Sequence, residues 1–333
     1  MKRYGDLFDK ITSFENLLNA ARKAQRGKRH KSSTAAFNLN FEKELLLLRS
    51  ELQNRTYRIG SYKRFQIHDP KKRLISALPY RDRVVQHALC NVIEPIFDRG
   101  LIYDAYACRK DKGSLRAVGR FTMYCRGHKY ALKCDVKSYF ASIEHDLLLG
   151  IIKGKIKDPA VLWLIKLIID STPSPGIPIG NLASQIFANL YLSGLDHYLK
   201  ETIGCGPYIR YMDDLVVFGE DKGRLGEIKD AINEYLRRLK LKLHPDKSRI
   251  YLSAGGIDFL GYKICPTHRL VIKQNVKRAR KRIKKQLRML RFKLIDWPRL
   301  IRSIRSWLGY AMHADSFNLR RRLLAEFDLL YEV

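Results

Sequence analysis

Near the middle of the chain the sequence reads Tyr208-Ile209-Arg210-Tyr211-Met212-Asp213-Asp214-Leu215-Val216-Val217-Phe218. Two apolar, β-prone arms flank a short polar centre, a pattern that predicts a β-hairpin with adjacent carboxylates at its tip. Neighbouring carboxylates repel one another unless a cation neutralises them. The pair is therefore typical of a site for a hard divalent metal that serves phosphoryl transfer. Taken alone, Asp213 and Asp214 could equally form a solvated turn.

The composition predicts a polyanionic partner. The chain has 64 Lys+Arg against 33 Asp+Glu, a net charge of +31. Such an excess points to nucleic acid or an anionic membrane surface, and 46% hydrophobic residues are ample for a packed core. No apolar run reaches the length of a membrane span, and residues 1–5 start no apolar signal-peptide core. The membrane alternative is therefore weakened.

The cysteines argue against a zinc or disulfide scaffold. Six of them are scattered singly along the chain, without a C-x-x-C pair. This spacing excludes the usual zinc-ribbon and disulfide frameworks. We expect reduced thiols in a cytosolic protein.

Hydrophobic patterning predicts a mixed helix and strand order. Helices are expected within residues 1–60, strands in the basic, aromatic-rich run 55–83, and a helix over 82–97. A buried strand over 130–135 ends in Asp135. Further along the chain, we expect a helix over 142–152, a Pro- and Gly-rich loop over 172–180, helices over 183–199 and 224–240, and short strands within 241–264.

The segment 273–305 is unusually basic. It holds fourteen Lys and Arg against one acid, Asp296. Its apolar residues recur at helical spacing, which predicts one helical face made of Val276, Ile283, Leu287, Leu290 and Leu294. A solvated surface helix is the alternative, but so one-sided a charge favours a helical module that lies along a nucleic-acid backbone.

Two-metal nucleotidyl transfer needs carboxylates from separate elements, a basic group for the triphosphate and a shaped floor beneath the sugar. Asp135 suits the first role, although alone it could be a turn or helix-capping residue. Arg73, within Lys71-Lys72-Arg73, suits the second role but could be a surface charge. Phe140 suits the third but could be an ordinary core residue.

Taken in order, these segments resemble the reverse transcriptase family over roughly residues 55–310. The resemblance implies an α+β, right-hand polymerase fold with fingers, a palm built on an antiparallel sheet, and a helical thumb. It divides the chain into an N-terminal helical extension (1–54), fingers and palm (55–266) and a basic helical thumb (267–333). It also implies an RNA-directed DNA polymerase that copies an RNA template into cDNA with two Mg²⁺ ions.

The first palm motif of the family is similar to Asp135-Val136-Lys137-Ser138-Tyr139-Phe140. By this resemblance Asp135 is a metal ligand, and Val136 offers its backbone carbonyl to a metal. Phe140 would be the steric gate that excludes a ribose 2′-hydroxyl. The second metal motif resembles residues 211–214, so Asp213 and Asp214 would complete the ligand set.

Three further segments have assigned roles in the family. Residues 71–73, together with Pro79 and residues 82–86, are similar to a finger segment in which Arg73 would contact the triphosphate. Lys247, in Leu243-His244-Pro245-Asp246-Lys247, matches the position that protonates the leaving pyrophosphate. The run Phe259-Leu260-Gly261 resembles the primer-grip turn.

One departure from the family pattern is informative. Most members carry Gln-Gly and then Ser-Pro beneath the incoming nucleotide, whereas this chain has Ile179-Gly180 and then Ser184-Gln185. This form resembles the reverse transcriptases of bacterial and phage diversity-generating retroelements, which copy a template-repeat RNA with frequent errors at adenines during mutagenic retrohoming. Ile179, Gly180 and Gln185 would then line the dNTP site. An apolar Ile179 would check pairing geometry less tightly than Gln, or it could be a mere packing variant.

The same resemblance implies partners and a location. The partners would be template-repeat RNA, primer or cDNA, dNTPs and a small basic pentameric accessory variability protein, in the cytoplasm of a bacterial or phage-infected cell. The alternative is a retron-type or other group II-like bacterial reverse transcriptase, including phage-defence types. Phe140 and Tyr211-Met212 argue against a template-dependent RNA polymerase. The joint presence of Asp135, Asp213, Asp214, Arg73 and Phe140 argues against a catalytically dead nucleic-acid-binding protein.

Overall fold

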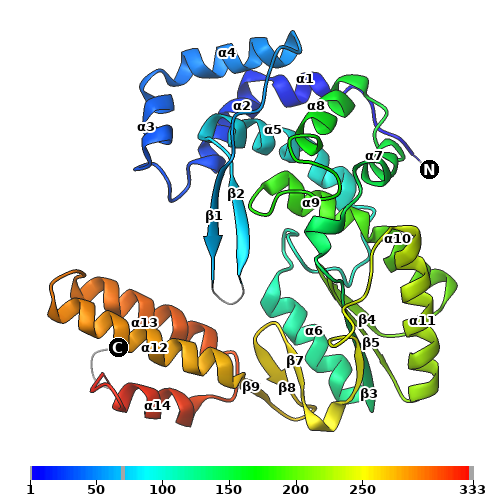
Figure 1. Cartoon of the computed structure of the whole chain (residues 1–333), viewed down its shortest axis with the longest axis vertical. Helices are drawn as coiled ribbons and strands as arrows, with labels where there is room; N and C mark the ends of the chain where they lie inside the picture. Colours follow the sequence, from blue (N-terminus) through cyan, green and yellow to red (C-terminus); the bar gives the residue numbers. More distant parts are fainter. Residues whose placement is uncertain (1, 69–71, 330–333) are drawn as a thin grey trace.

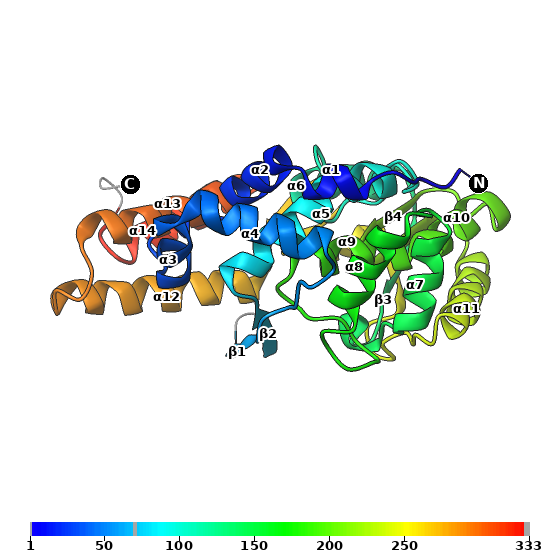
Figure 2. The same ribbon diagram turned by 90° about the horizontal axis from the view of Figure 1, so that it is seen from above.

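Helices at both ends of the chain flank a central antiparallel sheet (Figure 1). This computed structural model describes residues 2–68 and 72–329. Seen from above, the C-terminal helices extend away from the sheet at one end of the molecule (Figure 2). No helix in these described ranges is both long and apolar enough to cross a bilayer.

Four helices precede the first strand, as the sequence predicts for residues 1–60. They are α1 (Phe8–Thr12), α2 (Phe14–Ala24), α3 (Ser32–Leu39) and α4 (Phe41–Gln53). The Ser13 hydroxyl accepts a bond from the Asn16 amide and so caps α2. The apolar face of α2 is buried, and the helix packs on α5 (Tyr80–Asp98). The Tyr80 hydroxyl ties the two helices by donating to the Ala21 carbonyl at 2.8 Å.

A two-stranded hairpin projects from these helices (Figure 1). Strands β1 (Lys63–Ile67) and β2 (Arg73–Ala77) pair antiparallel, with Ile67 opposite Arg73. The strands expected within 55–83 are therefore confirmed, while Lys71 lies outside the described residues. Strand β1 is largely exposed, whereas β2 is exposed at Arg73 and Leu74 and buried at Ser76.

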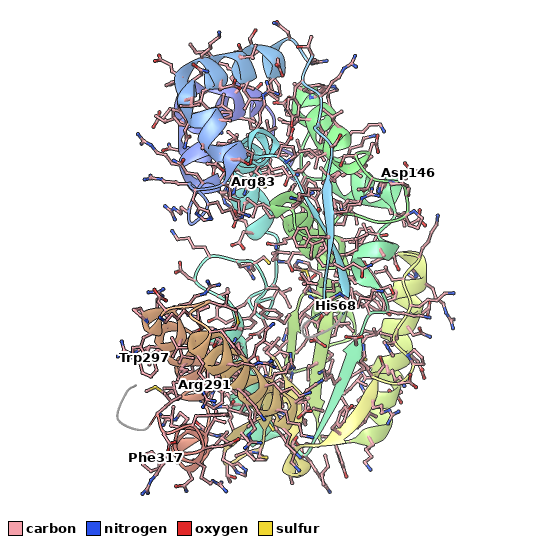
Figure 3. All side chains as sticks on the ribbon, turned by 60° about the vertical axis from the view of Figure 1, so that its left-hand side comes forward. His68, Arg83, Asp146, Arg291, Trp297 and Phe317 are labelled. Atoms are coloured by element: carbon pink, nitrogen blue, oxygen red, sulfur yellow. The ribbon has the colours of Figure 1, made fainter. Side chains whose placement is uncertain are left out.

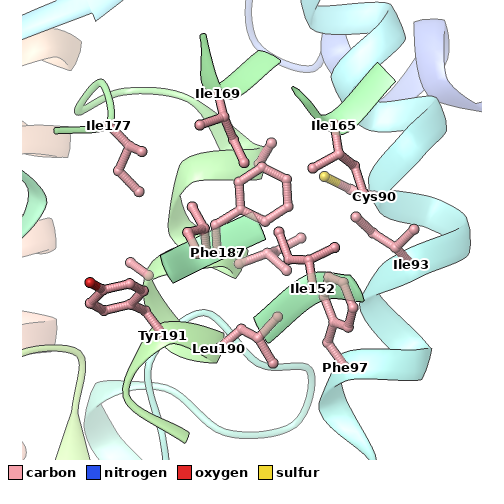
Figure 4. Packing of buried hydrophobic residues seen from close by; sticks show 14 of the residues in the cluster. Cys90, Ile93, Phe97, Ile152, Ile165, Ile169, Ile177, Phe187, Leu190 and Tyr191 are labelled. Carbon is pink, nitrogen blue, oxygen red and sulfur yellow. The ribbon is translucent and has the colours of Figure 1, made fainter. Parts of the chain in front are cut away.

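The main core lies where α5 meets α7 (His145–Lys153), α8 (Pro159–Ile169) and α9 (Leu182–Tyr191). Figure 4 shows this packing as a continuous apolar cluster. It is formed by Cys90, Ile93 and Phe97 of α5, Ile152 of α7, Ile165 and Ile169 of α8, and Phe187, Leu190 and Tyr191 of α9. This core holds α9 in place against α5.

Two of the expected helices differ in the structure. The helix predicted over 142–152 begins at His145, because Ser138 adopts a left-handed φ of 49° and Tyr139–Ser142 form a 3₁₀ turn. The helix predicted over 183–199 is divided into α9, α10 (Ser193–His197) and a π-helical turn over Tyr198–Thr202. Apolar periodicity alone does not reveal either interruption.

The central sheet has the strand order β4–β5–β3–β6 and is antiparallel throughout. Its strands are β3 (Tyr130–Asp135), β4 (Tyr208–Tyr211), β5 (Asp214–Gly219) and β6 (Arg249–Leu252). The strand predicted over 130–135 and the hairpin predicted over 208–218 are both confirmed. Alternate side chains enter two different cores, beneath α6 (Ser114–Gly127) on one face and α11 (Lys222–Arg238) on the other.

A small sheet connects the central sheet to the C-terminal helices. It contains β7 (Ile257–Phe259), β8 (Tyr262–Ile264) and β9 (Arg269–Val271). Helices α12 (Lys273–Arg291), α13 (Trp297–Ala311) and α14 (Phe317–Ala325) then share a core of their own. Leu294 was predicted to lie on the same helical face as the other apolar residues of this segment, but this is wrong, because α12 ends at Arg291; Leu294 is exposed.

Candidate active site

The β-sheet register brings together three carboxylates that are distant in sequence. Asp135 is the last residue of β3 and lies opposite Asp214, the first residue of β5. Asp213 occupies the turn before β5, and its carbonyl accepts a bond from the Val136 amide at 3.3 Å. The turn depends on Met212, which has a left-handed φ of 58°. The sequence-predicted residues Asp135, Val136, Asp213 and Asp214 are therefore neighbours.

The surroundings of Asp213 favour a cation. Burial, followed by the charges of Asp214 and Asp135, raises the pKa of its carboxyl to about 6, and the charge of Arg73 on β2 acts in the opposite direction. A desolvated carboxylate beside two others is the donor set that a hard divalent cation neutralises. These residues fit such a metal, although within the described part of the chain no three His, Cys, Asp or Glu side chains already stand in metal-binding geometry.

Two lysines partly neutralise the carboxylates. The Lys247 ammonium donates to Asp135 Oδ2 at 2.7 Å, so the structure places this predicted residue directly beside the first carboxylate. Lys133 Nζ lies 3.8 Å from Asp214 Oδ1 and donates to the Asp258 carbonyl at 2.9 Å. Lys133 was not identified from the sequence, since a lysine in an amphipathic strand carries no local signal of this role.

The chain segment before Lys247 is bonded to the end of β3. The Lys137 amide donates to the Lys242 carbonyl at 2.8 Å, and the His244 amide donates to the Asp135 carbonyl at 2.7 Å. The Ser248 hydroxyl accepts a bond from the Asp135 amide at 3.4 Å. These bonds hold Lys247 within reach of the carboxylate.

The predicted nucleotide floor is a set of loops joined by backbone bonds. The Ile177 amide donates to the Phe140 carbonyl at 2.8 Å, and the Ser76 amide of β2 donates to the Ile179 carbonyl at 2.9 Å. Phe140 and Ile179 are both half-buried. Arg73, three residues before Ser76, is exposed on the same strand. Strand β2 and the loop over 176–180 therefore form one unit beside the carboxylates.

Gly180 is required by this close approach. Its φ of +116° is a conformation that side chains strongly disfavour. A Cβ there would also lie 3.0 Å from Ile75 Cγ2 and 3.2 Å from the Ser76 carbonyl oxygen. Any larger residue would push β2 away from the loop.

Gln185 has a different setting from the other predicted nucleotide-site residues. It lies half-buried on α9, and its Oε1 accepts a bond from the Cys108 thiol at 3.4 Å. Its described hydrogen bond is therefore to the loop before α6 and not to the floor around Phe140 and Gly180.

A buried ion pair that the sequence did not reveal holds the hairpin that carries Asp213 and Asp214. Arg210 is fully buried, and its guanidinium binds both carboxylate oxygens of Asp196 at 2.6–3.0 Å. Its Nη1 also donates to the Met212 carbonyl and to Asn189 Oδ1, both at 3.1 Å. The Tyr208 hydroxyl donates to Asp196 as well, at 2.7 Å. The turn that carries Asp213 is thus held in place by residues of α9 and α10. The sequence feature that could have revealed this ion pair is a charged residue, Arg210, within an apolar strand.

The predicted primer-grip turn connects the small sheet to the C-terminal helices. Leu260 and Gly261 both have positive φ, of 46° and 93°. The Gly261 carbonyl accepts bonds from the Tyr310 hydroxyl at 2.5 Å and from Asn275 Nδ2 at 3.3 Å. The turn is therefore bonded to α12 and α13, and it lies between the central sheet and these helices.

Comparison with known proteins identifies the family. The family model described as "Reverse transcriptase (RNA-dependent DNA polymerase)" matches residues 67–264. Protein YkfC of Escherichia coli is 27% identical over 274 residues, which cover 66% of this chain and 71% of that protein. The group II intron-encoded protein LtrA of Lactococcus lactis is 23% identical and is matched over 48% of this chain and 29% of its own length.

Solved structures show the same fold. Apo telomerase from Candida tropicalis, truncated from its C-terminal domain, has a TM-score of 0.51 at 14% identity and matches 64% of this chain. The match spans about half of that telomerase chain, 55%. The predicted α+β, right-hand polymerase fold is confirmed. Because the family model covers more than half of the chain, the chain belongs to the reverse transcriptase (RNA-dependent DNA polymerase) family, a family of enzymes.

Proposed function

We propose that this chain copies an RNA template into cDNA by two-metal nucleotidyl transfer, with Asp135, Asp213 and Asp214 holding two Mg²⁺ ions. The single observation that carries the proposal is the β3–β5 register, which sets Asp135 opposite Asp214 and beside the desolvated Asp213. The Val136 carbonyl would add a further ligand. When bound, the two cations activate the primer 3′-hydroxyl and neutralise charge on the leaving pyrophosphate.

The remaining site residues would bind and orient the nucleotide. Arg73 would contact the triphosphate, Phe140 would exclude a ribose 2′-hydroxyl, and Gly180 would let the loop approach β2. Lys247 would donate its Nζ proton to the leaving pyrophosphate. Its contact with Asp135 supports the last role, because the ion pair holds the ammonium beside the proposed metal ligands.

The finer proposal is an error-prone enzyme of a diversity-generating retroelement. It is supported by Ile179, whose carbonyl is bonded to β2 while its side chain offers no hydrogen bond to a base pair. Gln185 would line the same site from α9. Template-repeat RNA and a small basic pentameric accessory protein would be the partners. A group II-like or retron-type enzyme is the second candidate, supported by the likeness to LtrA.

The domain division belongs to the same proposal. The extension (1–54) shares its core with α5, whereas the thumb (267–333) has a separate core from Val271 to Leu329. The outer face of α12 would follow the template–primer backbone. Its exposed cations recur at helical spacing on one side, and among the described residues they form no ion pair with a carboxylate. This basic stripe consists of Lys277, Lys281, Lys284, Arg288 and Arg291.

Asp213→Asn tests the catalytic proposal. The change removes one metal-binding charge while keeping the shape of the side chain. We expect cDNA synthesis in the presence of Mg²⁺ to fall by several orders of magnitude, because the metals carry most of the catalysis. RNA affinity should hold, since it depends on Lys and Arg elsewhere.

Asp230→Asn, on the exposed face of α11, is the matched control and should extend primers at the parental rate. Metal-dependent extension by the Asp213→Asn protein at a rate near that of the parent would refute the site assignment.

A further inference from the structure

The turn between α12 and α13 exposes large apolar side chains. Phe292 is 66% exposed, Leu294 67% and Trp297 39%; we call these three residues the thumb tip. The turn lies at the end of the molecule farthest along the thumb in both Figure 1 and Figure 2. Figure 3 labels Arg291 and Trp297 there, well apart from Phe317 at the start of α14.

The backbone of the turn is fixed, so the side chains of the thumb tip are presented in a defined arrangement. Lys293 adopts a left-handed φ of 55°. The Leu294 amide donates to the Met289 carbonyl and the Lys293 amide to the Leu290 carbonyl, each at 2.9 Å, which is the Schellman pattern of a helix end. Ile295 is buried in the thumb core. The rings are therefore held on a rigid turn.

The charge around the thumb tip is positive. The Arg288 guanidinium lies 5.9 Å from the Phe292 ring centroid, and Arg291 follows on the same helix. Asp296 is the single acid of the turn, and its carboxylate accepts a bond from the Arg299 amide, so it caps α13. Aromatic rings can stack on the bases of a nucleic-acid strand, and neighbouring Lys and Arg can bind its phosphates. The thumb tip offers both groups, because Arg288 and Arg291 form no ion pair with a carboxylate among the described residues.

We propose that the thumb tip binds unpaired nucleotides of the RNA template strand beyond the duplex that lies along α12. This inference rests on the proposed function. The 19 residues of α12 span about 28 Å, or about eight base steps, so a strand that follows the basic stripe reaches the tip. A duplex is not expected at the thumb tip, because its base faces are stacked and hidden from the rings. A basic protein is not expected either, because the basic stripe would repel it. An unpaired strand offers bases to the rings and phosphates to the cations.

The test compares RNA–DNA hybrids that are blunt or carry an unpaired RNA extension. Binding of the full-length protein is measured by fluorescence anisotropy over a salt series. We expect the extension to tighten binding about five- to 150-fold, the range of one stacked base. Phe292→Ala/Trp297→Ala should remove this gain and leave affinity for the blunt hybrid and its salt slope unchanged, because no phosphate contact is lost.

Phe317→Ala is the matched control, because Phe317 is also 66% exposed on the thumb but lies away from the turn. It should keep the full gain, and Trp297→Phe should keep most of it. If blunt hybrids bind and the extension adds nothing, this inference alone is wrong. If no hybrid binds, the proposed function is wrong too. A double variant that keeps the gain but loses self-association would make the tip an interface between copies, and would overturn the inference.

Discussion

Arg210 shows how one buried charge can set the geometry of the turn that carries Asp213. Its guanidinium joins Asp196 on α10, Asn189 on α9 and the carbonyl of Met212. A buried ion pair contributes little net stability, because desolvation offsets most of the attraction. Its effect here is positional: it holds Met212 in a left-handed conformation and thereby places Asp213 beside Asp135.

Variants of the ion pair should distinguish its contribution to the stability of the fold from its contribution to the position of Asp213. Arg210→Met leaves Asp196 buried without its cation and should cost about 3–5 kcal/mol of unfolding free energy. Arg210→Met/Asp196→Leu removes both charges and should recover most of that loss in urea unfolding. The double variant should still make cDNA about 100-fold more slowly, because small displacements of catalytic groups have such effects. A double variant that folds and extends at the parental rate would make Arg210 purely structural.

Phe140 offers a second residue-scale prediction. Phe140→Ala should widen the floor beneath the sugar and permit ribonucleotide incorporation, by lowering discrimination and not by accelerating the chemistry. Primer extension with ribonucleotides alone measures this, with deoxyribonucleotides as the reference for intact activity. Phe140 packs edge-on against Tyr139, at 5.7 Å between ring centroids. Equal discrimination by parent and variant would leave Phe140 with a packing role only.

The carboxylates could be predicted from sequence, whereas their supports could not. Asp135 at the end of an apolar strand and Asp213-Asp214 between apolar arms are local patterns. The partners of Arg210 are not local, because Asp196 and Asn189 lie 14 and 21 residues before it, on the consecutive helices α10 and α9. Lys133 likewise reaches Asp214 across the β3–β5 pair, and strand pairing is not encoded within either segment.

At the scale of elements, sequence periodicity predicted the strands of the hairpin and the helices α5 and α11 to within a few residues. It missed the interruption between α9 and α10, where the Ser193 hydroxyl bonds the Leu190 carbonyl. Sequence periodicity also placed Leu294 on the apolar face of the helix, because apolar spacing does not reveal the Schellman turn at Lys293 that ends α12.

The basic stripe of α12 makes an element-scale prediction. Replacing Lys281, Lys284 and Arg288 with Gln should reduce the slope of log affinity for an RNA–DNA hybrid against log salt by about two to three units, if each contacts one phosphate. Arg280 is left in place because it pairs with Glu326 at 2.8 Å. The measurement is an anisotropy titration at several salt concentrations.

The matched control for the stripe changes Arg299, Arg302 and Arg305 to Gln. These residues are exposed on α13 and carry the same total charge. This control should leave the slope nearly unchanged if the duplex lies along α12. Equal slopes for both triple variants would mean that the thumb attracts nucleic acid only through its overall charge.

At the scale of the whole molecule, the proposed check of base pairing would depend on two segments that are distant in sequence. Ile179 belongs to the loop before α9, yet its carbonyl is held by Ser76 of the fingers hairpin, and Gly180 permits that contact. A base pair that docks here meets a surface assembled from segments about 100 residues apart in sequence. On this proposal, copying accuracy depends on how these segments pack against each other. The side chain at position 179 is the single position where a substitution would change the contact with the base pair most directly.

Ile179→Gln should raise that accuracy. The new amide can hydrogen-bond beside Gly180, and one good hydrogen bond, worth about 1–1.5 kcal/mol, is roughly a tenfold drop in error frequency. Sequencing cDNA copied by parent and variant from an RNA with all four bases measures the effect. Errors at template adenines should be frequent for the parent and should fall most in the variant. Ile179→Leu, which stays apolar, should keep the parental errors. A parent that copies adenine as accurately as the other bases would leave a reverse transcriptase but remove the diversity-generating proposal.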